Sequence, residues 1–64
     1  MPKTHEIRAI VEKALENARA AGFGATRQTE HAVRTLMQLH PEMSEQDAVK
    51  AVLRVERPYE AGES

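Results

Sequence analysis

The signals that start and stop helices constrain this chain more than any other feature of its sequence. Gly22 followed by Phe23 is a typical helix stop, in which the glycine takes the left-handed C′ position and the apolar residue after it folds back on the last turn. Pro41 ends a second helical stretch, because proline disfavours helical backbone at the residue before it. Ser44, with Asp47 three residues later, is typical of an N-cap that begins a third helix. These signals divide the 64 residues into three helical segments.

Apolar residues recur with the α-helical period within each segment, and no segment alternates with the period of a strand. We therefore predict an all-α fold, a small three-helix domain with helices at about 4–21, 26–40 and 44–56. Thr4 and Thr26 are the expected N-caps of the first two helices. The residues expected to face the core are Ile7, Ile10, Val11, Ala14, Leu15, Ala18 and Ala21, then Ala32, Val33, Leu36, Met37 and Leu39, then Ala48, Val49, Val52, Leu53 and Val55.

A chain of this length has room for one hydrophobic core, so we predict a single helical domain over residues 1–57. Residues 58–64 are polar and contain proline and glycine, and we expect them to form a disordered tail. Glu56 falls within the apolar stripe of the third helix. The helix is therefore expected to fray near Glu56 or to end just before Pro58.

Composition narrows the classes of function. The net charge of −1 argues against a nucleic acid held by bulk charge alone. The chain has no cysteine, which points to a reducing compartment or to indifference to the redox state, and we expect a cytoplasmic protein. No apolar run is long enough for a signal peptide or a membrane span, so no membrane partner is expected.

Residues that could carry chemistry are sparse. The candidate metal ligands are His5, His31 and His40, and the last two are nine residues apart, which places them on opposite sides of one helix. Serine occurs only as the helix cap Ser44 and as Ser64, and there is no glycine-rich phosphate loop. We therefore expect no enzyme activity, no catalytic residue, no metal, no cofactor and no small-molecule substrate.

One polar ridge on the second helix has no structural role that the sequence reveals. Arg27, His31, Arg34 and Gln38 fall within an arc of about 60° opposite the apolar side of the helix, and they are our candidates for binding a partner. Arginine and glutamine on one helix face are also the residues of a DNA-recognition helix. Two arginines supply few phosphate contacts, however, and Glu30 lies near the ridge. A solvated basic face is the third interpretation.

Two families share short features with this chain. The stretch from Ala18 through Gly22 and Thr26 to Arg34 is similar to the helix–glycine–helix half of ribbon-helix-helix repressors. Residues 4–11 continue the helical stripe, so the DNA-reading strand of that family is missing and its function is not carried over. The Gly22-Phe23 turn also resembles the loop of ubiquitin-associated three-helix domains, but the spacing to the next apolar pair is too long. We assign the chain to neither family.

The expected core is thin, since the chain has only one phenylalanine and one tyrosine, and this favours docking on another protein. We therefore predict a non-enzymatic protein–protein interaction module, an adaptor or regulator that could form a homodimer. Its apolar edge residues, such as Ile10, Leu39 or Leu53, would stay partly open, and the basic ridge would supply orientation and specificity. The alternative is a small DNA-binding regulator that uses the second helix for recognition.

Overall fold

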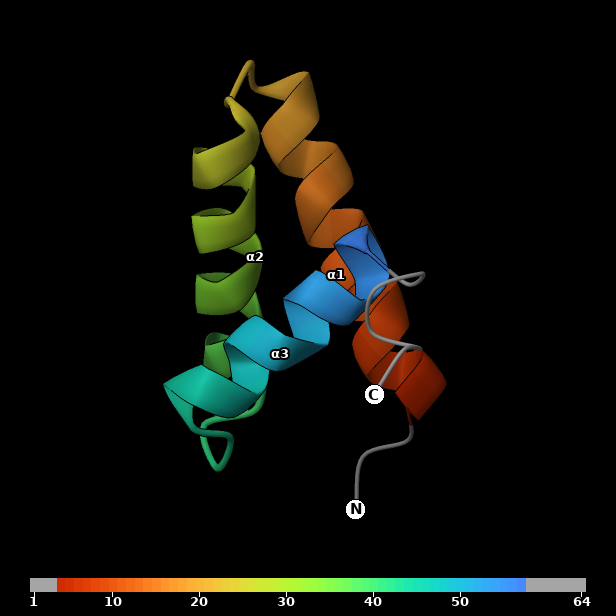
Figure 1. Ribbon diagram of the computed structural model, residues 1–64, viewed down its shortest axis with the longest axis vertical. Helices are drawn as coiled ribbons and strands as arrows, with labels where there is room; N and C mark the ends of the chain where they lie inside the picture. The colour runs from red at the N-terminus through yellow and green to blue at the C-terminus, as the bar shows by residue number, and fades with distance from the viewer. Residues whose placement is uncertain (1–3, 58–64) are drawn as a thin grey trace.

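The computed structural model describes residues 4–57, and it confirms the all-α, three-helix fold. Helix α1 spans Thr4–Ala20, α2 spans Ala25–Leu39 and α3 spans Glu45–Glu56. Helices α1 and α2 run in opposite directions from a tight turn, and α3 crosses both of them (Figure 1). The expected disordered tail at 58–64 lies outside the described residues. Helix α1 already includes Thr4, so the position that would cap it also lies outside them.

The turn after α1 forms as the sequence predicts. Gly22 has a φ of +86°, in the left-handed region that favours glycine. Its N–H donates to the carbonyl of Arg19 at 3.0 Å, and the N–H of Phe23 donates to the carbonyl of Ala18 at 3.0 Å. These two bonds are the Schellman pattern, which satisfies carbonyls that the end of the helix leaves unpaired. The turn therefore reverses the chain within a few residues and sets α2 against α1.

The predicted cap of α2 at Thr26 is wrong. The N-cap is Gly24, with extended backbone (φ −72°, ψ 175°) and no side-chain bond to the first turn. Gly24 is already extended as the chain leaves the Schellman turn, so the helix begins at Ala25, one residue earlier than expected, and Thr26 lies inside its first turn. At the other end α2 finishes at Leu39, and His40 is the C-cap residue before Pro41.

Helix α3 begins and ends where the sequence predicts. The Ser44 side chain accepts a hydrogen bond from the backbone N–H of Asp47 at 3.2 Å, which confirms the N-cap. Of the two expected ends, the one just before Pro58 is confirmed, because α3 includes Glu56 and Arg57 caps it; fraying near Glu56 is not the outcome. The Glu56 carboxylate accepts a hydrogen bond from Thr29 on α2, and this bond accounts for a half-buried acid in an apolar stripe.

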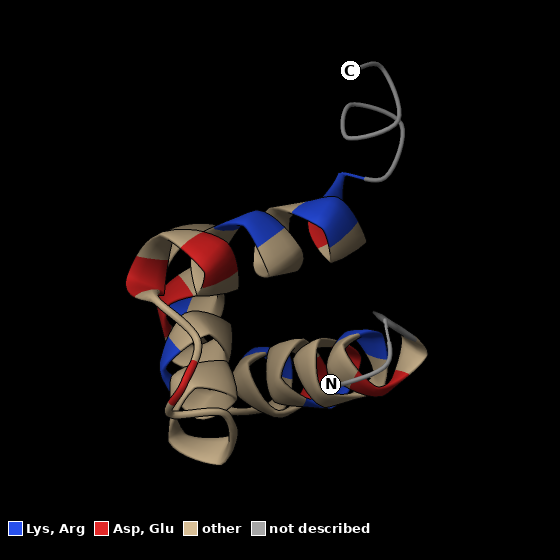
Figure 2. Ribbon diagram, turned by 90° about the horizontal axis from the view of Figure 1, so that it is seen from below, with Lys and Arg blue, Asp and Glu red and all other residues tan. Residues whose placement is uncertain are grey.

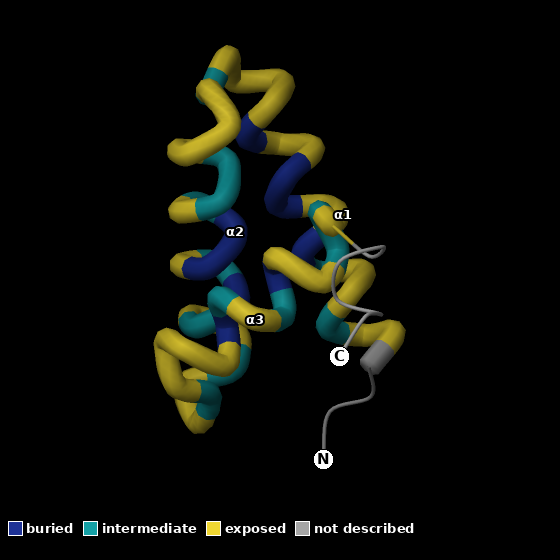
Figure 3. Tube along the Cα trace, viewed as in Figure 1, coloured by how far each residue is buried: buried dark blue, intermediate teal, exposed yellow. Residues whose placement is uncertain are grey.

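Each helix contributes one of the largest fully buried side chains, Val11 from α1, Leu36 from α2 and Val52 from α3. Smaller buried residues, Ala14, Ala32 and Ala48, lie in the same core cluster, and Figure 3 marks the buried segments along the chain. Leu39 and Leu53 continue apolar stripes but stay partly open, as expected of edge residues, whereas Ala21 was expected in the core and is exposed instead. The buried apolar residues are Val11, Ala14, Leu15, Ala18, Ala32, Val33, Leu36, Ala48 and Val52.

Helix α3 lies on one side of the α1–α2 pair (Figure 2). Glu45 and Asp47 in its first turn and Arg54 in its last complement the helix dipole, whereas Glu56 in the last turn opposes it. Within residues 4–57, no helix combines the length and the apolar character that crossing a membrane requires.

Candidate interaction surface

The ridge predicted from the sequence is divided by the fold into two halves with different surroundings. The first half packs on the turn after α1. The guanidinium carbon of Arg27 lies 5.2 Å from the centroid of the Phe23 ring, within the range of a cation–π contact. The imidazole of His31 meets the same ring edge-on, with 6.0 Å between centroids and 82° between planes. Arg27 and His31 therefore help to hold Phe23 in place.

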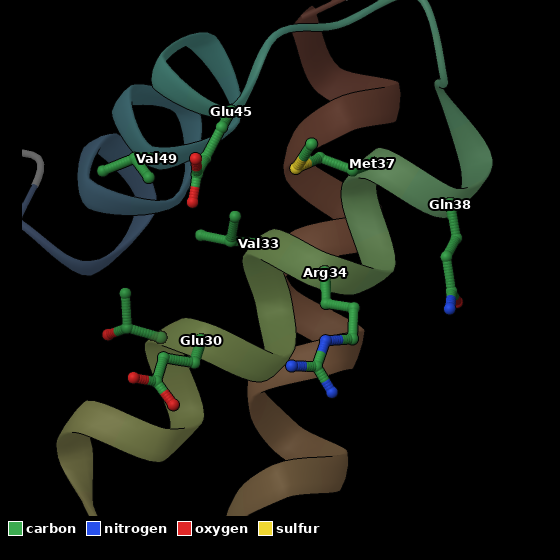
Figure 4. A pocket seen from close by; sticks show the side chains of 8 residues that line it. Glu30, Val33, Arg34, Met37, Gln38, Glu45 and Val49 are labelled. Carbon is green, nitrogen blue, oxygen red and sulfur yellow. The ribbon is translucent and has the colours of Figure 1, made fainter.

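The second half of the ridge, Arg34 and Gln38, lies at the edge of a groove between α2 and α3. Both side chains are exposed and point away from α3, whereas Val33 points toward Val49 (Figure 4). Neither makes a hydrogen bond or an ion pair with another described residue. The groove also contains Glu30 and Glu45, so its lining carries charges of both signs. The four candidate residues thus share one side of α2 but have different neighbours at its two ends.

A second groove, of about 400 Å³, lies between α1 and α2, and none of its lining residues comes from α3. Leu39 is 58% exposed in this groove, which makes it the most exposed large apolar residue of the described chain. It lines the groove together with half-buried Ile10 and buried Ala14. The other lining residues are Ala9, Lys13, Asn17, His31 and Thr35.

The sequence identified some of this groove but not its composition. Ile10 and Leu39 are expected open apolar residues, and His31 is a ridge candidate, yet nothing local predicts that these three line one groove. Lys13 and Thr35 were missed. Their helical spacing relative to Ile10 and Leu39 is a usable signal, since residues three or four apart share a helix face. The spacing becomes informative only once the mutual orientation of α1 and α2 is known.

Charge distinguishes the α1–α2 groove from its neighbours. Lys13 is the only lysine or arginine in its lining, and no carboxylate lines the groove. The groove between α1 and α3 contains Glu12, Glu16 and Glu56, and the α2–α3 groove contains two glutamates. The α1–α2 groove is thus the apolar one, with a cation on its wall.

The histidines that were considered as metal ligands lie in different places. His31 packs on Phe23, while the Nδ1 of His40 lies 3.1 Å from a carboxylate oxygen of Glu42 in the α2–α3 loop. Among residues 4–57, no group of three histidine, cysteine, aspartate or glutamate side chains is placed to hold a metal ion.

Comparisons with known proteins add no relative from which a function could be inferred. No protein-family model matches the chain, and no curated protein or solved structure matches it either. Residues 4–11 lie in α1, where a ribbon-helix-helix repressor has its DNA-reading strand. Any function must therefore be inferred from the fold and the surface of the chain itself.

Proposed function

We propose that this chain is a non-enzymatic interaction module, an adaptor or regulator that binds a helix of a protein partner in the α1–α2 groove. The observation that carries the proposal is the position of Leu39, 58% exposed in a groove that it lines with Ile10 and Ala14. A single exposed leucine is common on soluble proteins. A leucine on the wall of an apolar groove between two helices is a different case, because a third helix docked there would cover it.

The arrangement of the two helices supports a helical partner. Two neighbouring helices present ridges of side chains with a groove between them, and an amphipathic helix binds such a groove through apolar residues on one face. Small residues on α1, Ala9 and Ala14, line the groove and allow a close approach. Because Leu39 is 58% exposed, covering it would contribute roughly half the value of a fully buried leucine, about 1 to 1.5 kcal/mol.

We assign the basic ridge a supporting role in this proposal. His31 lies in the lining of the groove. Arg27 is four residues before it and Arg34 three residues after it, on the same side of α2. Exposed charges at the edge of an interface mainly set orientation and association rate, and they add less to affinity than the apolar contact. A cytoplasmic location is part of the proposal and rests on the absence of cysteine.

The test compares two leucine variants of the full chain. Leu39→Gln removes the apolar group from the groove, and Leu53→Gln makes the same change at the exposed leucine of α3, which does not line the groove. Each chain is immobilised, and the proteins it retains are identified and then tested as purified proteins for direct binding. A partner that binds the original chain and Leu53→Gln, but not Leu39→Gln, supports the proposal. Equal binding to all three chains overturns it.

A homodimer is one form that the module could take. Light scattering after gel filtration measures the mass of the chain in solution. A dimer that Leu39→Gln converts to a monomer supports the proposal with a second copy as partner. A monomeric chain that also retains no protein overturns it.

DNA binding through α2 is the second candidate, because Arg27, Arg34 and Gln38 are all exposed along one side of the helix. The contact between Arg27 and Phe23 counts against DNA binding, because this contact holds the Arg27 guanidinium at the turn. If α2 reads DNA, binding weakens steeply with added salt and falls with Arg34→Ala. Unchanged gel mobility of mixed-sequence DNA at low salt, with excess protein, overturns this candidate.

A further inference from the structure

We propose that the partner helix in the α1–α2 groove is acidic, with carboxylates beside its apolar residues. This inference rests on the proposed function and names the chemistry of the partner. It starts from the absence of carboxylates in the lining of this groove, whereas the α2–α3 and α1–α3 grooves described above each contain glutamates. An acidic helix would therefore meet no like charge in the α1–α2 groove.

The walls of the groove carry groups that pair with a carboxylate. Lys13 on α1 is exposed, and its ammonium group makes no hydrogen bond or ion pair with another described residue. By contrast, Arg8 on the same helix is paired with Glu12, with 3.4 Å between Nε and Oε2. Lys13 is thus a cation on the wall of an apolar groove without a counter-charge from the described chain. A carboxylate of the partner would supply that counter-charge.

The α2 wall contributes His31, Thr35 and Leu39 and no negative charge. His31 lines the groove, with Arg27 four residues before it and Arg34 three residues after it on the same side of the helix. In the described chain, the contact of His31 is with the Phe23 ring, which leaves its nitrogens without a hydrogen-bond partner there. A helix in the groove would thus have Lys13 on the α1 wall and His31, Thr35 and Leu39 on the α2 wall, with no carboxylate on either.

The apolar and polar parts of the lining make different contributions to binding. An apolar side chain of the partner fits against Ile10, Ala14 and Leu39, which supply the area that is removed from water. The ammonium of Lys13 selects the acidic partner, since opposite charges at the edge of an interface favour the right partner and like charges reject the wrong one. Affinity should therefore depend on Leu39, and the preference for acid on Lys13.

Two synthetic helical peptides test the inference against the full chain. Both carry leucines along one face, flanked by glutamates in the first peptide and by lysines in the second. Titration calorimetry measures the affinity, and amide chemical shifts show whether the peptide lies at the α1–α2 groove. We expect the glutamate peptide to bind at least about tenfold more tightly at low salt, with a difference that shrinks as salt is added.

Three variants make the result specific. Lys13→Glu should reduce or reverse the preference between the peptides. Lys50→Glu makes the same charge change on an exposed residue of α3 that does not line the groove, and it should leave the preference intact. Leu39→Gln should lower the affinity for the glutamate peptide by about tenfold, as expected for loss of an apolar anchor.

Each remaining outcome contradicts the inference in a recognisable way. Equal binding of both peptides at the groove shows that the acid preference is wrong, while the proposed function stands. If neither peptide shifts the amides of the groove, the acidic helix is rejected, and the variant comparison at Leu39 then decides the proposed function separately. A dimer whose dissociation on dilution shifts these amides replaces the acidic helix by a second copy.

Discussion

The hydroxyl of Thr29 on α2 donates a hydrogen bond to the carboxylate of Glu56 in the last turn of α3. Its oxygen lies 2.9 Å from one carboxylate oxygen and 3.1 Å from the other, and 3.2 Å from the carbonyl of Ala25. One hydroxyl hydrogen is shared among these acceptors. The bond joins two helices and gives a half-buried acid a partner, which keeps the end of α3 on α2.

Removal of this donor should destabilise the domain. Thr29→Val keeps the shape of the side chain and leaves the carboxylate without its partner, so we expect a loss of about 1 to 2 kcal/mol in the free energy of unfolding, measured by urea denaturation. Thr26→Val makes the same change at an exposed position of α2 and should cost less. Glu56→Gln should also cost less, because its amide oxygen still accepts the bond. Equal losses for Thr29→Val and Thr26→Val would contradict the role of the bond.

The left-handed backbone at Gly22 predicts a cost for any side chain at this position. No heavy atom lies within 4 Å of the position that a Cβ would take, so the cost comes from the φ of +86° and not from a collision. Gly22→Ala should lose about 1 to 2 kcal/mol of stability in urea denaturation. Gly22→Asn should lose less, because asparagine tolerates this conformation. Equal stability of Gly22→Ala and Gly22→Asn would contradict a cost that comes from the left-handed backbone.

The start of α2 can be improved. Gly24 caps this helix without a side-chain bond, its φ of −72° suits any residue, and the space around it is open. Gly24→Asp should raise the free energy of unfolding by about 0.5 to 1 kcal/mol, because a carboxylate accepts from the free N–H groups and favours the positive end of the dipole. Gly24→Ala adds a side chain that accepts no bond, and it should not stabilise the chain. A gain with alanine equal to that with aspartate would rule out capping as the cause.

Truncation of two leucines three residues apart on α2 should change the stability of the domain by very different amounts. Leu36 is fully buried, and Leu36→Ala should cost about 2 to 5 kcal/mol, enough to unfold a small domain. Leu39 is mostly exposed, and Leu39→Ala should change stability by less than about 0.5 kcal/mol. Circular dichroism during urea denaturation measures both. A large loss for Leu39→Ala would assign this residue to the core and remove the basis of the proposed groove.

Acidic pH should weaken the loop between α2 and α3. A hydrogen bond from its own backbone N–H, and then the bond with the His40 side chain, lowers the pKa of Glu42 below its ordinary value. A carboxylate with a lowered pKa in the folded state stabilises the fold at pH above its unfolded pKa, and this contribution disappears as the pH falls through the folded pKa. Glu42→Gln should therefore be less stable than the original chain near neutral pH, and the difference should vanish in acid.

A second variant separates this contact from the loss of charge. Glu30→Gln removes the same charge from the exposed side of α2, where no hydrogen bond or ion pair with a described residue is affected. Its stability relative to the original chain should change less between neutral and acidic pH. If the stability of the two variants depends on pH in the same way, the hydrogen bonds at Glu42 are not the cause of the pH dependence.

The sequence by itself determined where the helices stop and where the third one starts. Gly22 with Phe23, Pro41 and Ser44 act through backbone bonds and steric limits within one or two turns, so no distant residue can overrule them. The cap at Thr26 was mispredicted for the same kind of reason: the preceding turn had already placed Gly24 in extended backbone, and the helix could begin earlier.

The tertiary structure alone decided which sides of these helices are covered. An apolar arc on a helix does not say where its neighbours lie, and α3 covers only one side of the α1–α2 pair. Leu39 therefore stays exposed although it continues an apolar stripe, and Glu56 finds a partner on α2 although it interrupts one. The basic ridge of α2 was visible in the sequence. Its division between Phe23 and a separate groove followed only when the helices packed, because helix packing depends on the whole set of contacting side chains.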